Sequence, residues 1–205
     1  MRSAEAFSLL RTNAQAFFTT REAAAILKCP SPSATKLLQN LTDLGLIRRV
    51  EQGRWAVNPS ASSLEYASWV AAPLPSYISL YTALFHRGII QQIPRTIYVV
   101  SLAKTEMVQT DLGDYSIHQI SPALFRGYVD ENGIKMATAE KALFDTLYLE
   151  RATSGKFTAL TEVELPENFD RQELLSYLDL ITDTVAGVRR RASDSIRDFL
   201  VKVDG

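Results

Sequence analysis

The spacing of apolar and polar residues between positions 17 and 58 predicts a short helix, a turn, a second helix and a hairpin. Thr19 and Glu22 have capping-box spacing, so a helix is expected to begin there and to continue through Leu27. Pro30 and Pro32 are expected to end it, because helix interiors exclude proline. In residues 33–44, apolar side chains recur at spacings that give a helix one buried stripe. These side chains are Ala34, Leu37, Leu38, Leu41 and Leu44.

A basic hairpin is expected directly after this second helix. Gly45 stands where a left-handed C-cap is needed. Residues 46–50 and 54–57 favour two short strands, and residues 51–53 favour the turn that joins them. A helix, a tight turn, a helix and a basic hairpin are typical of a winged helix-turn-helix, a fold that binds DNA.

The candidate DNA-binding side chains lie on the polar face of the second helix and on the hairpin. Short hydroxyls and a lysine suit contacts to phosphate, and Gln39 and Asn40 can make bidentate contacts to adenine in the major groove. The hairpin arginines can follow a phosphate backbone or enter a minor groove. The predicted DNA-binding residues are Ser33, Thr35, Lys36, Gln39, Asn40, Arg48, Arg49 and Arg54. The alternative is that this face is only a solvated surface, since some winged-helix modules bind protein alone.

The remaining sequence predicts a mixture of strands and helices. A first helix is expected at residues 3–16 and a linker at 58–63, where small polar residues surround Pro59. Beyond the linker, helices are predicted at 76–87, 138–151, 171–185 and 190–201; strands at 96–102 and 114–121; and a hairpin at 127–137. The strand at 114–121 is expected to be covered on one side. The predicted fold class is therefore α+β, with an N-terminal winged helix-turn-helix at 1–58 and a mixed α+β domain at 64–205.

The distribution of charge supports two different roles for these domains. The chain has a net charge of −1, which alone argues against nucleic-acid binding. Residues 1–58, however, hold eight Lys/Arg against four Asp/Glu, a balance of +4, while the remainder has a balance of −5. This asymmetry places the expected nucleic-acid footprint in the N-terminal domain. The basic run 189–191 has two interpretations: a solvated helix end, or a second surface for phosphate or an acidic partner.

Composition indicates a cytoplasmic protein of one large or two small domains. No apolar run approaches the roughly 20 residues that span a bilayer, and the N-terminus lacks the apolar core of a secretory signal. The single cysteine, Cys29, has no partner for an internal disulfide and is expected to be a packing residue.

The sequence predicts a binding protein and not an enzyme. His86 and His118 lack cysteines or acids at ligand spacing, so no metal is expected. The phosphate-binding and nucleophile motifs built on glycine are absent, so no cofactor is expected either. Glu140 and Asp145 lie about 140° apart around a helix, which is unsuitable for paired catalytic carboxylates. The alternative to a binding protein is a hydrolase that has none of these motifs.

Three segments carry a resemblance to a known family. They are PSYISLYTAL at 75–84, PRTIYVVS at 94–101 and ATAEKALFD at 137–145. With the helix-turn-helix ahead of them, they resemble the antitoxins of AbiE-type abortive-infection systems. The third motif usually has proline before Glu-Lys-Ala-Leu; Ala139 takes its place here and suits the first helical position equally well.

The resemblance implies a transcriptional regulator paired with a nucleotidyltransferase-like toxin, which it neutralises without necessarily forming a stable complex. The expected function is therefore an antitoxin that also represses its own operon, with duplex operator DNA and the cognate toxin as partners. The alternative is a stand-alone winged-helix transcription factor whose second domain binds a ligand or dimerises.

Overall fold

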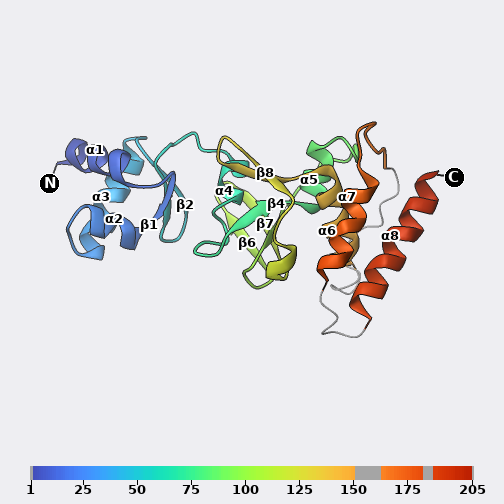
Figure 1. Cartoon of the computed structure of the whole chain (residues 1–205). Coiled ribbons are helices and arrows are strands. Elements are labelled where there is room, and N and C mark those ends of the chain that lie inside the picture. Colours follow the sequence, from blue (N-terminus) through green and yellow to red (C-terminus); the bar gives the residue numbers. More distant parts are fainter. Residues whose placement is uncertain (1, 151–162, 182–186, 205) are drawn as a thin grey trace. The chain divides into compact units, whose positions relative to one another are not determined.

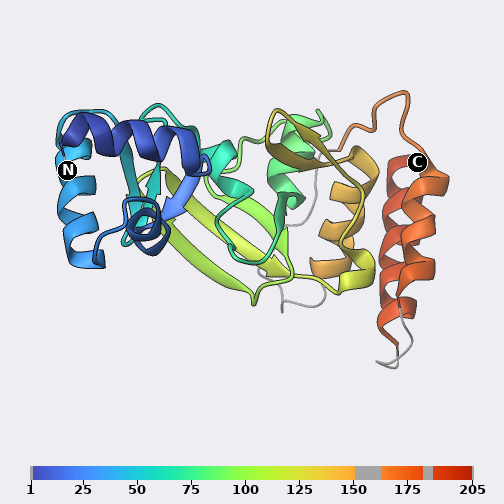
Figure 2. The ribbon, with the colours of Figure 1, turned by 60° about the vertical axis from the view of Figure 1, so that its left-hand side comes forward.

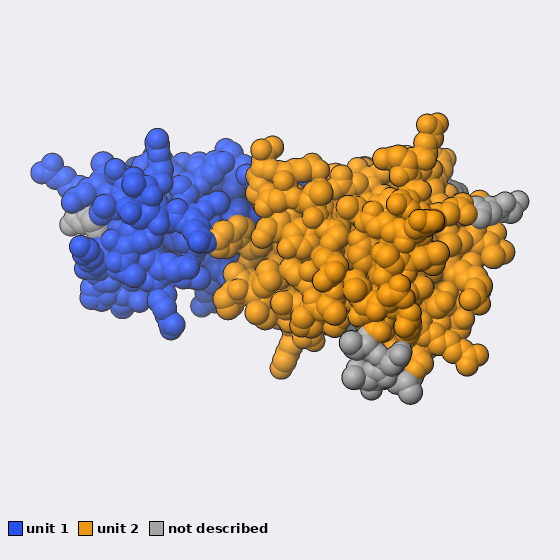
Figure 3. Space-filling model, in the orientation of Figure 1, with its two compact units in different colours: residues 1–66, 109–113 blue, residues 67–108, 114–205 orange. Residues whose placement is uncertain are grey.

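The computed structural model describes residues 2–150, 163–181 and 187–204 (Figure 1). The fold is mixed α+β and contains a three-stranded and a six-stranded sheet. The chain divides into two compact units, coloured separately in Figure 3. Unit 1 comprises Met1–Tyr66 and Gln109–Gly113, and unit 2 comprises Ala67–Val108 and Asp114–Gly205.

Unit 1 packs three helices against a small antiparallel sheet of order β1-β3-β2 (Figure 1). The core joins Leu10 of the first helix, Leu38 and Leu41 of the third, and Trp55 of the sheet. Free Cys29 packs against this core, as predicted. In chain order the elements are α1 (Ser3–Asn13), β1 (Phe17–Thr19), α2 (Thr20–Ile26), α3 (Ser31–Asp43), β2 (Arg48–Glu51) and β3 (Arg54–Ala56).

The predicted capping box is confirmed, whereas the predicted limits of α3 are wrong. Thr19 caps α2: its hydroxyl accepts from Glu22 N (3.2 Å) and its backbone N–H donates to the Glu22 carboxylate (2.6 Å). The prolines do not delay α3 as expected. Pro30 is its N-cap and Pro32 lies in its first turn, where a missing N–H has no intrahelical partner to lose. Leu44, expected in the buried stripe, is the C-cap and is 62 % exposed.

The third strand of unit 1, β1, was not predicted. Residues Phe17–Thr19 pair with β3, so that Phe18 lies opposite Trp55, and the sheet has three strands instead of the two expected. A segment this short has too few residues to show the alternation that identifies a strand.

Unit boundaries differ from the predicted domains in two respects. Tyr66 belongs to unit 1, and its ring packs edge-on against Phe17 with centroids 5.0 Å apart. Tyr66 lies in α4 (Ser63–Ala67), which begins inside the expected linker because Ser62 and Glu65 cap it. Unit 1 also includes Gln109–Gly113, where Asp111 N donates to Val50 O (2.9 Å). No local pattern predicts a pairing between segments so far apart in sequence.

Unit 2 is built on a sheet of order β6-β7-β5-β4-β9-β8 (Figure 2). β5 is antiparallel to β4 and parallel to β7, and β4 is parallel to β9. The strands are β4 (Ser76–Ile78), β5 (Ile97–Ser101), β6 (Glu106–Thr110), β7 (Gly113–Gln119), β8 (Tyr128–Glu131) and β9 (Ile134–Ala137). The tip that joins β6 to β7 is the segment assigned to unit 1.

In unit 2, α5 and α6 pack on this sheet, and α7 and α8 pack on α6. α5 contacts β5 and α6, and α6 contacts β9, α7 and α8 (Figures 1 and 2). The helical segments are α5 (Leu80–His86), the single turn η1 (Pro122–Leu124), α6 (Ala139–Glu150), α7 (Arg171–Ser176), the turn η2 (Tyr177–Leu180) and α8 (Val188–Asp204). The ends predicted at 151 and at 182–185 lie outside the described residues.

Two predictions for unit 2 are wrong. Residues 76–78, expected to begin a helix, form β4 inside the sheet, because a short apolar run suits a buried strand as well as a helix. The strand at 114–121, expected to be covered on one side, is buried on both from Tyr115 to His118. Its inward polar pair, Ser116 Oγ and His118 Nε2, lies 2.9 Å apart, and this hydrogen bond makes the burial tolerable.

The predicted hairpin at 127–137 and the helix after it are confirmed. Asn132 and Gly133 both have positive φ, at 56° and 86°, as a tight hairpin turn requires. Thr138 caps α6 by accepting from Lys141 N (3.2 Å).

Candidate nucleic-acid interface

Five of the predicted DNA-binding residues lie on α3, and all five side chains are exposed. At about 100° per residue, Lys36, Gln39 and Asn40 fall within about 100° of the helix surface. They lie opposite the buried side chains of Ala34, Leu38 and Leu41. Ser33 and Thr35 are about 160° apart around the helix, so they occupy opposite margins of this face. Lys36, Gln39 and Asn40 therefore form the centre of the candidate interface.

Two details of α3 limit its capacity to bind phosphate. The Thr35 hydroxyl donates to Ser31 O (2.9 Å), and phosphate oxygens only accept, so this donor is already engaged. Asp43 is exposed and lies close to the angular position of Lys36, two turns further along the helix. Its carboxylate places a negative charge beside the amides of Gln39 and Asn40.

The three predicted hairpin arginines occur in different environments. Arg49 is exposed, and its Nε donates to Glu51 O (3.4 Å). Arg48 is half-buried, and its Nη2 donates to Asp111 O (2.8 Å). Arg54 is also half-buried; its Nη1 donates to the Tyr66 hydroxyl (3.0 Å) and lies 3.4 Å from the Glu51 carboxylate.

Tyr66 and Asp111 are structural partners of the hairpin that sequence analysis did not identify. The Tyr66 hydroxyl donates to Glu51 Oε1 (2.6 Å). Burial, and then this hydrogen bond to Glu51, raise the pKa of Tyr66 well above its usual value, so the hydroxyl keeps its proton. Tyr66 follows the expected linker in sequence, so nothing in the local pattern indicated that it contacts the hairpin.

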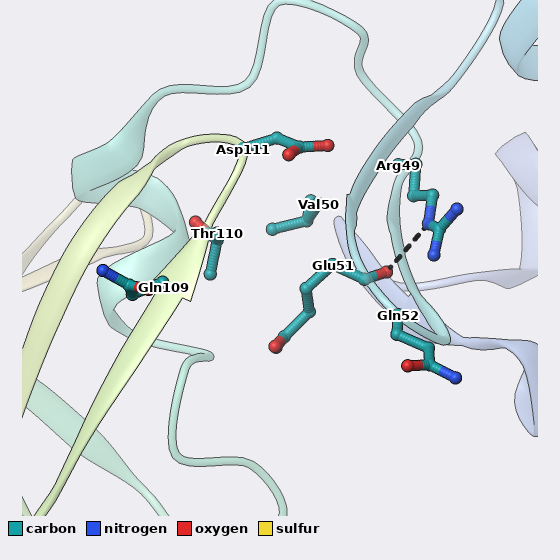
Figure 4. Close-up of a pocket in the computed structure, with 7 residues that line it drawn as sticks. All are labelled: Arg49, Val50, Glu51, Gln52, Gln109, Thr110 and Asp111. Atoms are coloured by element: carbon teal, nitrogen blue, oxygen red, sulfur yellow. Dashed lines mark hydrogen bonds between the residues drawn. The ribbon is translucent and has the colours of Figure 1, made fainter.

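A polar cleft of about 430 Å³ lies beside the hairpin (Figure 4). In Figure 4 the Glu51 side chain points toward Gln109 and Thr110, whereas the Arg49 guanidinium lies on the opposite side of the strand. The carboxylates of Glu51 and Asp111 thus face the cleft. Seven residues line it: Arg49, Val50, Glu51, Gln52, Gln109, Thr110 and Asp111.

A second constellation is buried in unit 2. Asp145 accepts hydrogen bonds from the Tyr77 hydroxyl (2.9 Å) and the Ser79 hydroxyl (2.8 Å), and it is paired with Lys141. Lys141 Nζ also lies 5.1 Å from the ring centroid of Phe144 and 5.3 Å from that of Tyr177. Burial lowers the pKa of Lys141, and the neighbouring carboxylate partly offsets this.

This buried network joins the segments that carried the family resemblance. Tyr77 and Ser79 come from the first motif, and Asp145 comes from the third. The second motif is attached by the Ser101 hydroxyl, which donates to Pro75 O (2.8 Å). Glu140 has a separate partner, accepting from Asp170 N (3.0 Å), so Glu140 and Asp145 do not share a site, as their spacing predicted.

The basic run at the start of α8 is partly paired. Arg189 Nη2 donates to Asp179 Oδ1 (2.5 Å), and the three arginines are exposed. The opposite face of α8 buries Ala192, Ile196 and Phe199. Pairing of Arg189 reduces the positive charge available here and favours the solvated helix end over a second phosphate contact.

Comparison with known proteins gave no match: no family model matches the chain, and no curated protein matches its sequence. Among the described residues, no group of three or more His, Cys, Asp or Glu side chains is arranged to hold a metal ion. In the same part of the chain, no helix has both the length and the apolar character needed to cross a membrane.

Proposed function

We propose that unit 1 is a winged helix-turn-helix that binds duplex operator DNA. The observation that carries this proposal is the exposed polar face of α3, where Lys36, Gln39 and Asn40 lie together without a covering element among the described residues. Lys36 supplies attraction to phosphate, and the two amides supply the donor and acceptor pairs that distinguish bases in the major groove. The succession of α2, a short turn, α3 and the β2–β3 hairpin is the order of elements in this motif.

The charge of unit 1 supports the same function. It holds eight Lys/Arg against six Asp/Glu, a balance of +2, because Glu65 and Asp111 join the four acids of residues 1–58. Unit 2 holds 14 basic and 17 acidic residues, a balance of −3. A duplex is therefore attracted to unit 1 and not to unit 2.

We propose further that the whole chain is an autoregulatory antitoxin of the AbiE type, with a nucleotidyltransferase-like toxin as its partner. This half of the proposal rests on the three motifs, and the buried contacts among Tyr77, Ser79 and Asp145 support it. Residues that contact one another in one core are expected to occur together in related sequences. The motifs that hold them therefore count as one resemblance and not as separate ones.

Two experiments test the two halves. For DNA, a labelled duplex from the region upstream of the gene is titrated with the full chain at several salt concentrations. Affinity is expected to fall steeply with salt, because each neutralised phosphate releases counterions. If the chain does not bind the duplex, or if its affinity does not change with salt, the proposed DNA-binding function is wrong.

For the antitoxin half, the adjacent open reading frame is expressed with and without this chain, and cell growth is measured. Growth arrest by the neighbour alone, relieved by this chain, is the expected result. A harmless neighbour would leave the stand-alone transcription factor as the better description.

A further inference from the structure

The register of the small sheet in unit 1 places the hairpin arginines on two different faces. Arg49 lies opposite Trp55, and Trp55 lies opposite Phe18 in the next strand. Paired residues project to the same side of a sheet. Because Trp55 and Phe18 belong to the core formed with α2 and α3, Arg49 lies on the face that the helices cover.

Arg48 and Arg54 lie on the other face. Arg48 is paired with Ala56, and Arg54 precedes Ala56 by two residues, so both share its side of the sheet. Phe17, also paired with Ala56, shows what covers this side, since its ring packs against Tyr66.

Both arginines on the second face make hydrogen bonds within unit 1. Arg54 is hydrogen-bonded to Tyr66 and paired with Glu51. The side chain of Arg54 is 28 % exposed and that of Glu51 is 24 % exposed. The carboxylate balances the charge of Arg54 where water is partly excluded. Arg48 is bonded to the backbone oxygen of Asp111. The adjoining cleft is lined by the acidic residues Glu51 and Asp111, and the guanidinium of Arg49, which also lines it, lies on the opposite side of the strand (Figure 4).

We propose that Arg49 is the hairpin residue that contacts DNA phosphate, on the same side of the sheet as α3, and that Arg48 and Arg54 instead hold the hairpin in place. The DNA contact surface of unit 1 is then α3 with Arg49. Its second face, with Tyr66 and Asp111, is turned away from the duplex. This assignment rests on the proposed DNA-binding function, and it limits to Arg49 a phosphate contact that was predicted for all three arginines.

The test measures the salt dependence of duplex binding by the full chain. A labelled duplex of about 30 base pairs from the upstream region gives about three helical turns. Affinities are measured between about 50 and 200 mM salt, and log K is plotted against log salt concentration. Arg49→Ala is expected to reduce the steepness of this line by about 0.9, the value for one phosphate contact, and Arg49→Lys to restore it.

Arg48→Ala and Arg54→Gln are expected to leave the slope unchanged, as is the exposed control Arg95→Ala in unit 2. The glutamine keeps polar groups near Glu51 and Tyr66 while removing the charge, so unit 1 is expected to fold; the melting temperature verifies this. Tyr66→Phe provides a second variant with every cation intact, and its slope is expected to equal that of the parent.

A drop in slope for Arg48→Ala or Arg54→Gln as large as that for Arg49→Ala would overturn the assignment while leaving DNA binding intact. An unchanged slope for Arg49→Ala would overturn it as well. Failure of the parent to bind any duplex would instead refute the proposed function on which the assignment depends.

Discussion

Lys141 carries a charge into the interior of unit 2, where it is fully buried beside Asp145. Removing two charges from water is unfavourable, and the pair is offset by mutual attraction, by the hydroxyls of Tyr77 and Ser79, and by the aromatic faces around the ammonium. Such a pair adds little net stability compared with apolar residues, but the loss of one partner leaves an uncompensated charge.

Lys141→Met is therefore expected to destabilise the protein by about 3–5 kcal/mol, since it leaves Asp145 buried and unpaired. The double variant Lys141→Met/Asp145→Leu should lose clearly less than the sum of its two single variants, because the two sites share one interaction. Urea denaturation of the four proteins provides the free energies. Additive losses would show that the two side chains are not coupled.

His118 makes stability depend on acidity. Burial lowers the pKa of His118 to about 4, below its usual 6.5. Between these values the unfolded chain therefore binds a proton more readily than the folded one. The contribution of His118 to stability is fully present above pH 6.5 and is lost as the pH falls toward 4. The histidine accounts for about 3 kcal/mol over this range.

His118→Gln should flatten the pH dependence of the free energy of unfolding between pH 6.5 and 4, relative to the parent. Both proteins also contain titrating carboxylates, so the difference between the two curves is the quantity that isolates His118. Parallel curves would mean that the imidazole titrates normally in the fold.

Residues whose contacts are local in sequence were predictable, whereas residues whose contacts come from distant segments were not. Thr19 and Glu22 are three positions apart and form the box that their spacing predicted. Lys141 gave no signal, because lysines are normally exposed, and two of the rings around its ammonium, Tyr77 of β4 and Tyr177 of η2, are distant in sequence.

One residue of α3, Asp43, opposes the DNA contact that we propose for this helix. Asp43 lies on the exposed face of α3 in its last turn, where the negative end of the helix dipole and DNA phosphate both disfavour a carboxylate. The other residues of the proposed interface on α3 are basic or uncharged and polar.

Asp43→Asn is expected to tighten duplex binding severalfold and to leave thermal stability equal or slightly raised, by about 0.3–1 kcal/mol. Anisotropy titrations and melting curves measure the two effects. Glu5→Gln on α1 changes charge equally without altering α3 and serves as the control. Unchanged binding by Asp43→Asn would show that this face of α3 does not approach DNA.

At the scale of elements, long periodic helices and the Asn132-Gly133 hairpin were predicted, whereas the strands β1, β4 and β6 were not. β1 and β4 have three residues each and are specified by pairing with distant strands. β6 is an edge strand whose residues are mostly exposed, so its sequence lacks an apolar stripe. The candidate interface was predictable because α3 is long enough for its buried stripe to fix the exposed face.

For the whole molecule, the proposal assigns DNA binding and toxin neutralisation to different units. Point variants separate them better than truncation, because unit 1 includes Gln109–Gly113 and Tyr66, which a fragment ending near residue 60 lacks. Lys36→Ala on α3 and Leu143→Asp in the core of unit 2 are suitable, since one side chain is exposed and the other fully buried.

Lys36→Ala is expected to relieve repression of the operon and to preserve rescue from the toxin. Leu143→Asp is expected to abolish rescue, because an unpaired carboxylate in the core unfolds unit 2. A reporter fused to the promoter and the growth of toxin-expressing cells are measured together with the soluble level of each variant. Loss of rescue by soluble Lys36→Ala would contradict the division of roles.

Sequence discrimination by α3 tests the account most directly. The affinity of the full chain is measured for the duplex upstream of its gene and for a shuffled duplex of equal composition, with the parent, Gln39→Ala and Asn40→Ala. Each substitution is expected to lose about 1–3 kcal/mol of binding free energy on the upstream duplex and much less on the shuffled one. Equal losses on both duplexes, or no preference by the parent, would contradict the claim that α3 recognises an operator.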